Sequence, residues 1–141
     1  RFLRSHSAVG PTLPRMVARV KRPGAKQRTG AFGEEVTAQY LLARGDEILD
    51  RNWRIREGEI DLVSLGSDGA FHFIEVKTRS SLAFGHPFEA INREKAHRMQ
   101  RLAMGWLATH GCLGCEYSID VVAILIAADG THTLEYRGNL L

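Results

Sequence analysis

The sequence predicts an α/β fold, a mixed β-sheet flanked by helices, with the order helix, three strands, helix, two strands. Apolar side chains recur at helical spacing in two segments and alternate with polar ones in five others. Turn residues, chiefly Gly and Asp-Gly, separate these segments. A chain of 141 residues with 44% hydrophobic residues has the size and apolar content of one domain.

The first helix is predicted by Phe32, Val36, Tyr40 and Leu41, which share one face, and Gly45 can end it. Strands are expected at residues 48–54, 59–65 and 70–78. A long helix is expected over residues 88–109, with these side chains on its buried side: Ile91, Met99, Leu102, Ala103 and Trp106. Two strands, residues 117–126 and 133–137, follow around an Asp-Gly turn.

The second and third strands carry charges in their middle, where small domains usually keep apolar residues. We expect residues 67–69 to form a three-residue loop with Gly69 in the left-handed conformation, so that Gly66 faces Ala70. Counting back from this loop places Asp61 opposite Glu75, with Cβ atoms roughly 4.5 to 5.5 Å apart. Two carboxylates so close repel each other unless a cation lies between them.

Lys77 lies on the same strand face as Glu75, two residues along. Carboxylate oxygens suit Mg²⁺ or Mn²⁺, which is held by one or two carboxylates together with water and phosphate oxygens. A lysine ammonium beside the metal can orient the attacking water and stabilise negative oxygen. The predicted chemistry is therefore phosphodiester hydrolysis. Glu59 shares the face of Asp61 and could bind metal, polarise water or pair with Lys77, or it could simply form an ion pair at the strand end.

Asp61 followed by Glu75-Val76-Lys77 resembles the core of the PD-(D/E)XK nucleases, although Ile60 replaces the proline that usually precedes the aspartate. Further motifs occur in the order seen in the YraN family of uncharacterised bacterial proteins, described as predicted endonucleases similar to Holliday junction resolvases. These motifs are Gly30-Ala31-Phe32-Gly33-Glu34, Arg51-Asn52-Trp53-Arg54, Gly58-Glu59-Ile60-Asp61-Leu62, Glu75-Val76-Lys77-Thr78-Arg79, Phe84-Gly85-His86-Pro87, Lys95 and Asp120-Val121-Val122. Ser118 and Ile119 stand where the family commonly has an arginine and an aromatic residue.

The resemblance implies a restriction-endonuclease-like fold, cleavage of DNA that is branched or otherwise distorted, and a homodimer. It also implies that Glu34 is an auxiliary acid of the site, although a glutamate near a helix start can instead favour the helix dipole. The alternative is a non-cleaving nucleic-acid-binding module or DNA-processing assembly factor on the same fold.

Four basic residues are candidate nucleic-acid contacts. Arg79 follows the strand of Glu75 and Lys77 and could clamp a phosphate. Lys95 falls on the inward face of the long helix, where it could point into the active cleft or snorkel past the core edge. Arg93 and Arg101 form a separate stripe, which could follow a nucleic-acid backbone or be a solvated face.

The basic charge is concentrated at the N-terminus. Residues 1–28 contain eight Lys or Arg and no acid, which leaves eleven basic and sixteen acidic residues in 29–141, a net charge of −5. We expect a disordered tail over 1–28, with Met16 as a candidate native start, and a single nuclease-like domain over 29–141. No apolar stretch is long enough for a membrane helix, and a cytoplasmic location is expected.

Cys112 and Cys115 form a single Cys-X-X-Cys pair after His110. Such a pair can act as a redox couple, or bind zinc if two further ligands join it. The favoured interpretation is two loop cysteines without function, because no second pair exists.

Overall fold

A computed structural model describes residues 25–83 and 85–141 of the chain, as two α-helices, a 3-10 helix and five strands. In chain order these are α1 (Ala25–Ala43), β1 (Glu47–Ile55), β2 (Gly58–Leu65), β3 (Phe71–Arg79), the 3-10 helix η1 (Pro87–Ala90), α2 (Arg93–Thr109), β4 (Tyr117–Ile126) and β5 (His132–Arg137). The predicted order of helices and strands is confirmed. Within the described range, no helix is both long and apolar enough to span a membrane.

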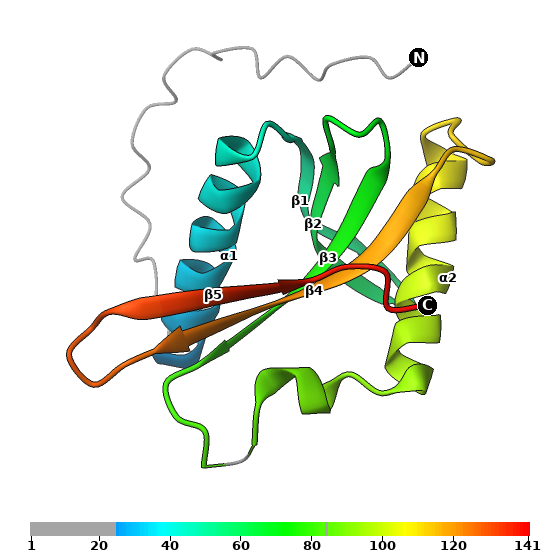
Figure 1. The fold of residues 1–141 in the computed structure, drawn as a ribbon. Coiled ribbons are helices and arrows are strands. Elements are labelled where there is room, and N and C mark those ends of the chain that lie inside the picture. The colour runs from blue at the N-terminus through cyan, green and yellow to red at the C-terminus, as the bar shows by residue number, and fades with distance from the viewer. Residues whose placement is uncertain (1–24, 84) are drawn as a thin grey trace, which may run out of the picture.

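The five strands form one mixed sheet in the order β1-β2-β3-β4-β5. Neighbouring strands are antiparallel except β3 and β4, which are parallel. A parallel pair needs a long crossover, and the segment containing η1 and α2 supplies it. Figure 1 shows α1 and α2 on opposite sides of the sheet.

Each helix covers its own apolar core. On the α2 side, the fully buried Trp106 packs against Phe71 and Phe73, with ring centroids 5.6 Å away in both pairs. On the α1 side, Leu41 packs with Ile74 and other aliphatic side chains of the sheet. A sheet buried on both faces explains why β2 and β4 contain nearly continuous buried runs.

Four of the five strands differ from their predicted bounds by one residue at one or both ends, and two helix boundaries differ by more. α1 begins at Ala25, so residues 25–28, assigned to the tail, are helical, while Met16 lies outside the described residues. α2 begins at Arg93 instead of near residue 88, because the Asn92 side chain caps it by accepting the Lys95 N–H at 2.8 Å. Phe88 belongs to η1, which starts at Pro87.

Gly33 brings α1 close to β3. A Cβ atom built at Gly33 would lie 1.8 Å from Thr78 Oγ1, so any larger residue would push the helix away from the strand. Thr37, one turn further along α1, is fully buried and donates its hydroxyl to the Gly33 carbonyl at 2.7 Å. The close approach places the first half of α1, including Glu34, beside the charged part of β3.

Candidate active site

The predicted hairpin between β2 and β3 is confirmed in loop and register. Gly69 has φ +82°, and the Gly66 N–H donates to the Ala70 carbonyl at 2.9 Å. From the loop the pairing runs through Leu65 with Phe71 to Leu62 with Ile74. Continued by one pair, this register would place Asp61 opposite Glu75, as the sequence predicts.

The ladder stops before it reaches Asp61. Instead of continuing the backbone pairing, the Asp61 carboxylate accepts the Val76 N–H at 2.8 Å. On the other side of β2, Asn52 lies between the paired positions Arg51 and Trp53 and has φ +51°. Repulsion between facing carboxylates accounts for the early end of the ladder, which leaves Asp61 at a break in the sheet.

Asp61 is 6% exposed and lies among other carboxylates. Burial first, and then the negative charge of Glu75, raise the pKa of Asp61 to about 7 from its ordinary 3.8. The Val76 N–H favours the charged form and only partly offsets this, while Glu34 and Glu59 raise the pKa further. The structure therefore gathers four sequence-predicted acids at one place.

Glu34 joins the cluster from α1 and is half-buried. Burial raises its pKa, a hydrogen bond with the Asn52 side chain lowers it, and the charges of Glu59 and Glu75 raise it again. Asn52 is a site residue that the sequence analysis missed, since it appears there only within the motif Arg51-Asn52-Trp53-Arg54. The sequence feature that could have identified it is an asparagine inside a strand pattern, because asparagine tolerates the left-handed backbone conformation.

Lys77 forms an ion pair with Glu75, in which its Nζ lies 3.1 Å from Glu75 Oε1. Both side chains are mostly shielded from solvent, with 19% and 23% of their surface exposed. Glu59 pairs with Arg54 at 2.6 Å and not with Lys77, which matches the strand-end ion pair considered from the sequence. Within the cluster, Lys77 thus pairs with Glu75, and Arg54 pairs with Glu59.

A cleft of about 190 Å³ opens between the sheet and α2 beside this cluster. Glu59 and Glu75 line its sheet wall, and Lys95 and Arg98 line the α2 wall. Gly58, also in the lining, has φ +151°, and a Cβ there would approach Leu102 to 3.3 Å. The apolar remainder of the lining comes from these residues: Ile91, Met99 and Leu102. Lys95 therefore faces the cleft, as considered from the sequence, and Arg98 was missed.

The other predicted basic contacts lie apart from this cleft. Arg79 lines a separate groove with Leu82 and Leu125, and its guanidinium donates to the Thr78 carbonyl at 3.1 Å. Arg93 and Arg101 are exposed on α2, and neither lines the cleft. Their predicted role on a nucleic-acid backbone stays a prediction.

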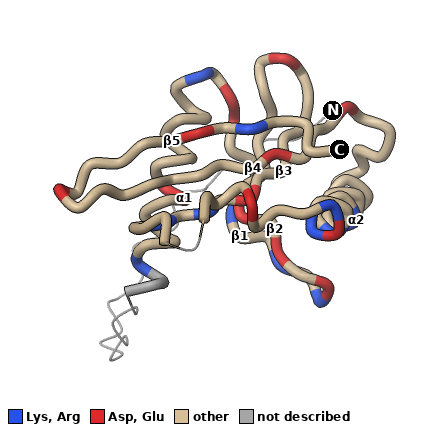
Figure 2. The backbone as a smooth tube through the Cα atoms, turned by 60° about the horizontal axis from the view of Figure 1, so that its bottom comes forward, with Lys and Arg blue, Asp and Glu red and all other residues tan. Residues whose placement is uncertain are grey.

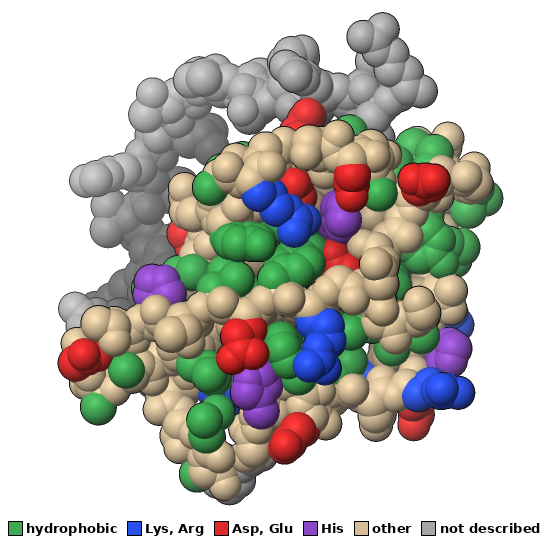
Figure 3. Space-filling view, viewed as in Figure 1, with side chains coloured by type: hydrophobic (Ala, Val, Ile, Leu, Met, Phe, Trp, Pro, Cys, Tyr) green, Lys and Arg blue, Asp and Glu red, His purple; other side chains and the backbone are tan. Residues whose placement is uncertain are grey.

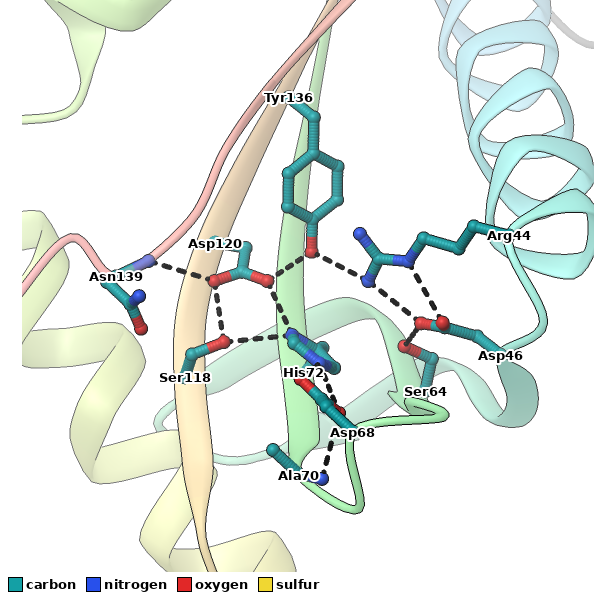
Figure 4. Close-up of polar contacts among 10 residues, drawn as sticks. All are labelled: Arg44, Asp46, Ser64, Asp68, Ala70, His72, Ser118, Asp120, Tyr136 and Asn139. Atoms are coloured by element: carbon teal, nitrogen blue, oxygen red, sulfur yellow. Dashed lines mark hydrogen bonds and ion pairs between the residues drawn. The ribbon is translucent and has the colours of Figure 1, made fainter.

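A second polar network lies on β3 and β4, centred on the fully buried Asp120 (Figure 4). His72 Nδ1 lies 2.8 Å from Asp120 Oδ2, and the Ser118 hydroxyl donates to Asp120 Oδ1 at 2.8 Å. The Tyr136 hydroxyl and the Asn139 N–H also donate to this carboxylate. Burial alone would raise the pKa of Asp120, but the bonds from His72, Tyr136 and Ser118 outweigh it and hold the pKa below its ordinary value.

The network continues from Tyr136 to the end of α1. Arg44 donates to the Tyr136 hydroxyl at 3.2 Å and to both carboxylate oxygens of Asp46, which also accepts the Ser64 hydroxyl. Its polar groups are satisfied by one another, so it serves to tie α1 to the sheet. Sequence reasoning singled out only Asp120 of this set, because the partners come from distant elements.

Cys112 and Cys115 occupy the loop after α2. The Cys115 N–H donates to the Cys112 carbonyl at 3.1 Å, Cys112 is buried and Cys115 is exposed, and both thiols are free. Burial and then Cys115 raise the pKa of the Cys112 thiol, which disfavours the reactive thiolate. Between residues 25 and 141, Phe84 excepted, no three or more His, Cys, Asp or Glu side chains form a group that could hold a metal ion.

A metal at the acidic cluster would therefore be held by two carboxylates, Asp61 and Glu75, and not by a closed protein cage. This donor set fits Mg²⁺ or Mn²⁺, because these ions take oxygen ligands and keep open positions for water and phosphate. Burial first, and then the negative charge of Glu75, raise the pKa of Asp61, and a bound cation would favour its charged form. The residues present fit a hard divalent cation.

Comparisons with known proteins agree with the family resemblance that the sequence motifs indicate. A family model described as "Uncharacterised protein family UPF0102" matches residues 33–124. A UPF0102 protein of Beutenbergia cavernae is 49% identical over 79% of this chain and 94% of its own length. One from Frankia alni is 52% identical over 71% and 82%, and one from Arthrobacter sp. is 46% identical over 79% and 94%.

Among solved structures, a repair endonuclease from Pyrococcus abyssi matches 77% of this chain with 18% identity and a TM-score of 0.38. The match spans only 40% of that chain. At this score, nothing about activity follows from the likeness.

Proposed function

Because the chain belongs to the uncharacterised protein family UPF0102, whose name assigns no activity, we propose a function from its own site. The protein is a Mg²⁺- or Mn²⁺-dependent endonuclease that hydrolyses phosphodiester bonds in DNA. The observation that carries the proposal is the buried Asp61 at the break between β2 and β3, next to Glu75 and its ion-paired Lys77.

Asp61 and Glu75 would hold the metal, which when bound supplies a Lewis acid for the phosphate and lowers the pKa of a bound water. Lys77 is fixed by its ion pair with Glu75, so its ammonium can donate a hydrogen bond to the attacking water or to the negative oxygen that develops. Glu34, oriented by Asn52, adds a further acceptor at the edge of the cluster. A catalytic role for Glu59 stays a prediction, because its carboxylate already forms an ion pair with Arg54.

A second candidate is a nucleic-acid-binding module that does not cut. The observation in its favour is charge, because residues 29–141 carry a net −5 and a nucleic acid is a polyanion. Figure 3 shows acidic and basic side chains interspersed on the face viewed, without a broad basic surface. The set of Asp61, Glu75 and Lys77 favours the nuclease, since binding alone has no need for buried repelling carboxylates.

The test is a panel of labelled duplex, single-stranded, flap and four-way-junction DNA, with Mg²⁺, Mn²⁺ or a chelator. Wild-type protein should cut at least one substrate in a metal-dependent way, with junction or flap DNA preferred. Asp61→Ala and Lys77→Ala should lose that activity while remaining folded by circular dichroism. Cutting by both folded variants at the wild-type rate would refute the site, and no cutting of any substrate by wild type would favour the binding module.

A further inference from the structure

The cleft beside the acidic cluster has walls of opposite charge. Its sheet wall presents Glu59 and Glu75, and its α2 wall presents Lys95 and Arg98. Opposite charges across a narrow cleft usually pair directly, and such pairing would close it. Here each carboxylate bonds elsewhere, Glu59 with Arg54 and Glu75 with Lys77.

The two cations on the α2 wall are left without an acid. In the described ranges 25–83 and 85–141, neither the Lys95 nor the Arg98 side chain forms an ion pair or a hydrogen bond. They lie three residues apart on one helix, which places their side chains side by side. Like charges held together repel, and an anion between them and the sheet wall would relieve that repulsion.

The first half of α2 concentrates basic residues, as the blue part of this helix in Figure 2 shows. Residues 93–101 contain Arg93, Lys95, Arg98 and Arg101 with a single acid, Glu94, and residues 102–109 have no charged Asp, Glu, Lys or Arg. Only the middle two of the four basic residues line the cleft. Arg56, at the exposed turn between β1 and β2, has the same charge and lies outside both the cleft and the set of predicted nucleic-acid contacts, which makes it a matched comparison for Arg98.

We propose that Arg98, together with Lys95, forms a phosphate-binding subsite that holds the backbone of the strand to be cut against the α2 wall. That this strand is cut rests on the proposed function, whereas the binding of a phosphodiester needs only the two cations and the cleft. The guanidinium of Arg98 can bind two phosphate oxygens at once, whereas Lys95 adds a point charge. The strand then runs between α2 and β3, with the next phosphate at the carboxylates.

The experiment measures binding of a fluorescent single-stranded oligonucleotide by anisotropy, in chelator, over a series of salt concentrations. Arg98→Gln should lower the affinity about tenfold and reduce the slope of log affinity against log salt by about 1, as the loss of one phosphate contact requires. Arg56→Gln should leave both nearly unchanged. Both residues are exposed, so both variants should fold, and their melting temperatures would be compared with wild type.

Competition identifies the source of the phosphate. An unlabelled oligonucleotide should displace the probe, whereas inorganic phosphate at the same phosphate concentration should not; displacement by inorganic phosphate as effectively as by the oligonucleotide would overturn a strand subsite. Equal losses in Arg98→Gln and Arg56→Gln, or no binding by wild type at low salt, would also overturn it. A wild-type protein that binds through Arg98 but never cuts would refute the proposed function and leave the subsite intact.

Discussion

Replacing Asp61 by asparagine should stabilise the protein while removing its proposed activity. The pKa of Asp61 is raised from an ordinary 3.8 to about 7, so the folded state binds this proton more tightly than the unfolded chain does. The contribution of Asp61 to stability is therefore fully present below pH 3.8 and is lost as the pH rises through about 7. A pKa difference of this size corresponds to roughly 4 kcal/mol at most.

Asparagine has no charge to bury, and its carbonyl oxygen can still accept the Val76 N–H. We expect Asp61→Asn to raise the free energy of unfolding at pH 8 by about 2 kcal/mol, because solvent and relaxation reduce the full electrostatic cost. The difference should shrink towards pH 4, where the wild-type carboxyl is protonated. Glu57→Gln, on the exposed turn between β1 and β2, should leave stability unchanged at both pH values.

The assay is urea denaturation in chelator at pH 5 and pH 8, followed by tryptophan fluorescence. Added Mg²⁺ or Mn²⁺ should then stabilise the wild type, by about 2.7 kcal/mol at a hundred times its dissociation constant, and should leave Asp61→Asn unaffected. If Asp61→Asn lowers stability by more than about 1 kcal/mol at pH 8 without metal, the carboxylate is stabilised by its surroundings and the reasoning is wrong.

Three further outcomes can be measured. Gly33→Ala should destabilise the protein by about 1 to 3 kcal/mol, because the added methyl group would meet Thr78. Gly30→Ala, with open space around the added methyl group, should be neutral or slightly stabilising. Equal melting temperatures for the two variants would contradict the close contact between α1 and β3. Asp120→Asn should lower the free energy of unfolding, measured by chemical denaturation, by about 3 kcal/mol, since it removes the buried negative charge that pairs with His72. A loss below about 1 kcal/mol would show that the network contributes little. The hydrogen bond to Asp120 raises the pKa of His72, so protonated His72 stabilises the fold fully below pH 6.5 and less as the pH rises through the folded pKa. NMR titration of the His72 ring should give a pKa above 6.5. A pKa below 6.5 would exclude the charged pair of His72 and Asp120.

The hairpin was predictable because its determinants are local. Gly69 fixes the loop, and a loop of known length fixes every later pair through the two-residue period of a strand. The sequence indicates repulsion between Asp61 and Glu75 but not the break itself, which also involves the bond from the Val76 N–H to the Asp61 carboxylate and the left-handed Asn52 in β1.

Which basic stripe of α2 faces the cleft also depends on packing. Sequence spacing separates the stripe of Lys95 from that of Arg93 and Arg101, but the position of the sheet decides that Arg98 lines the cleft. The network around Asp120 is harder still to predict from the sequence, because Arg44 and Tyr136 meet only after α1 and β5 have packed against each other.

The central claim is that Asp61, Glu75 and Lys77 form a metal-dependent phosphodiester site. The most direct measurement is the rate of metal-initiated cleavage of bound flap or junction DNA by wild type and by Lys77→Met, with Mn²⁺ binding measured in parallel. The account predicts that Lys77→Met still binds Mn²⁺ and DNA but cuts at least a hundredfold more slowly, as the loss of a group that stabilises the transition state implies. Cleavage by Lys77→Met at the wild-type rate would contradict it.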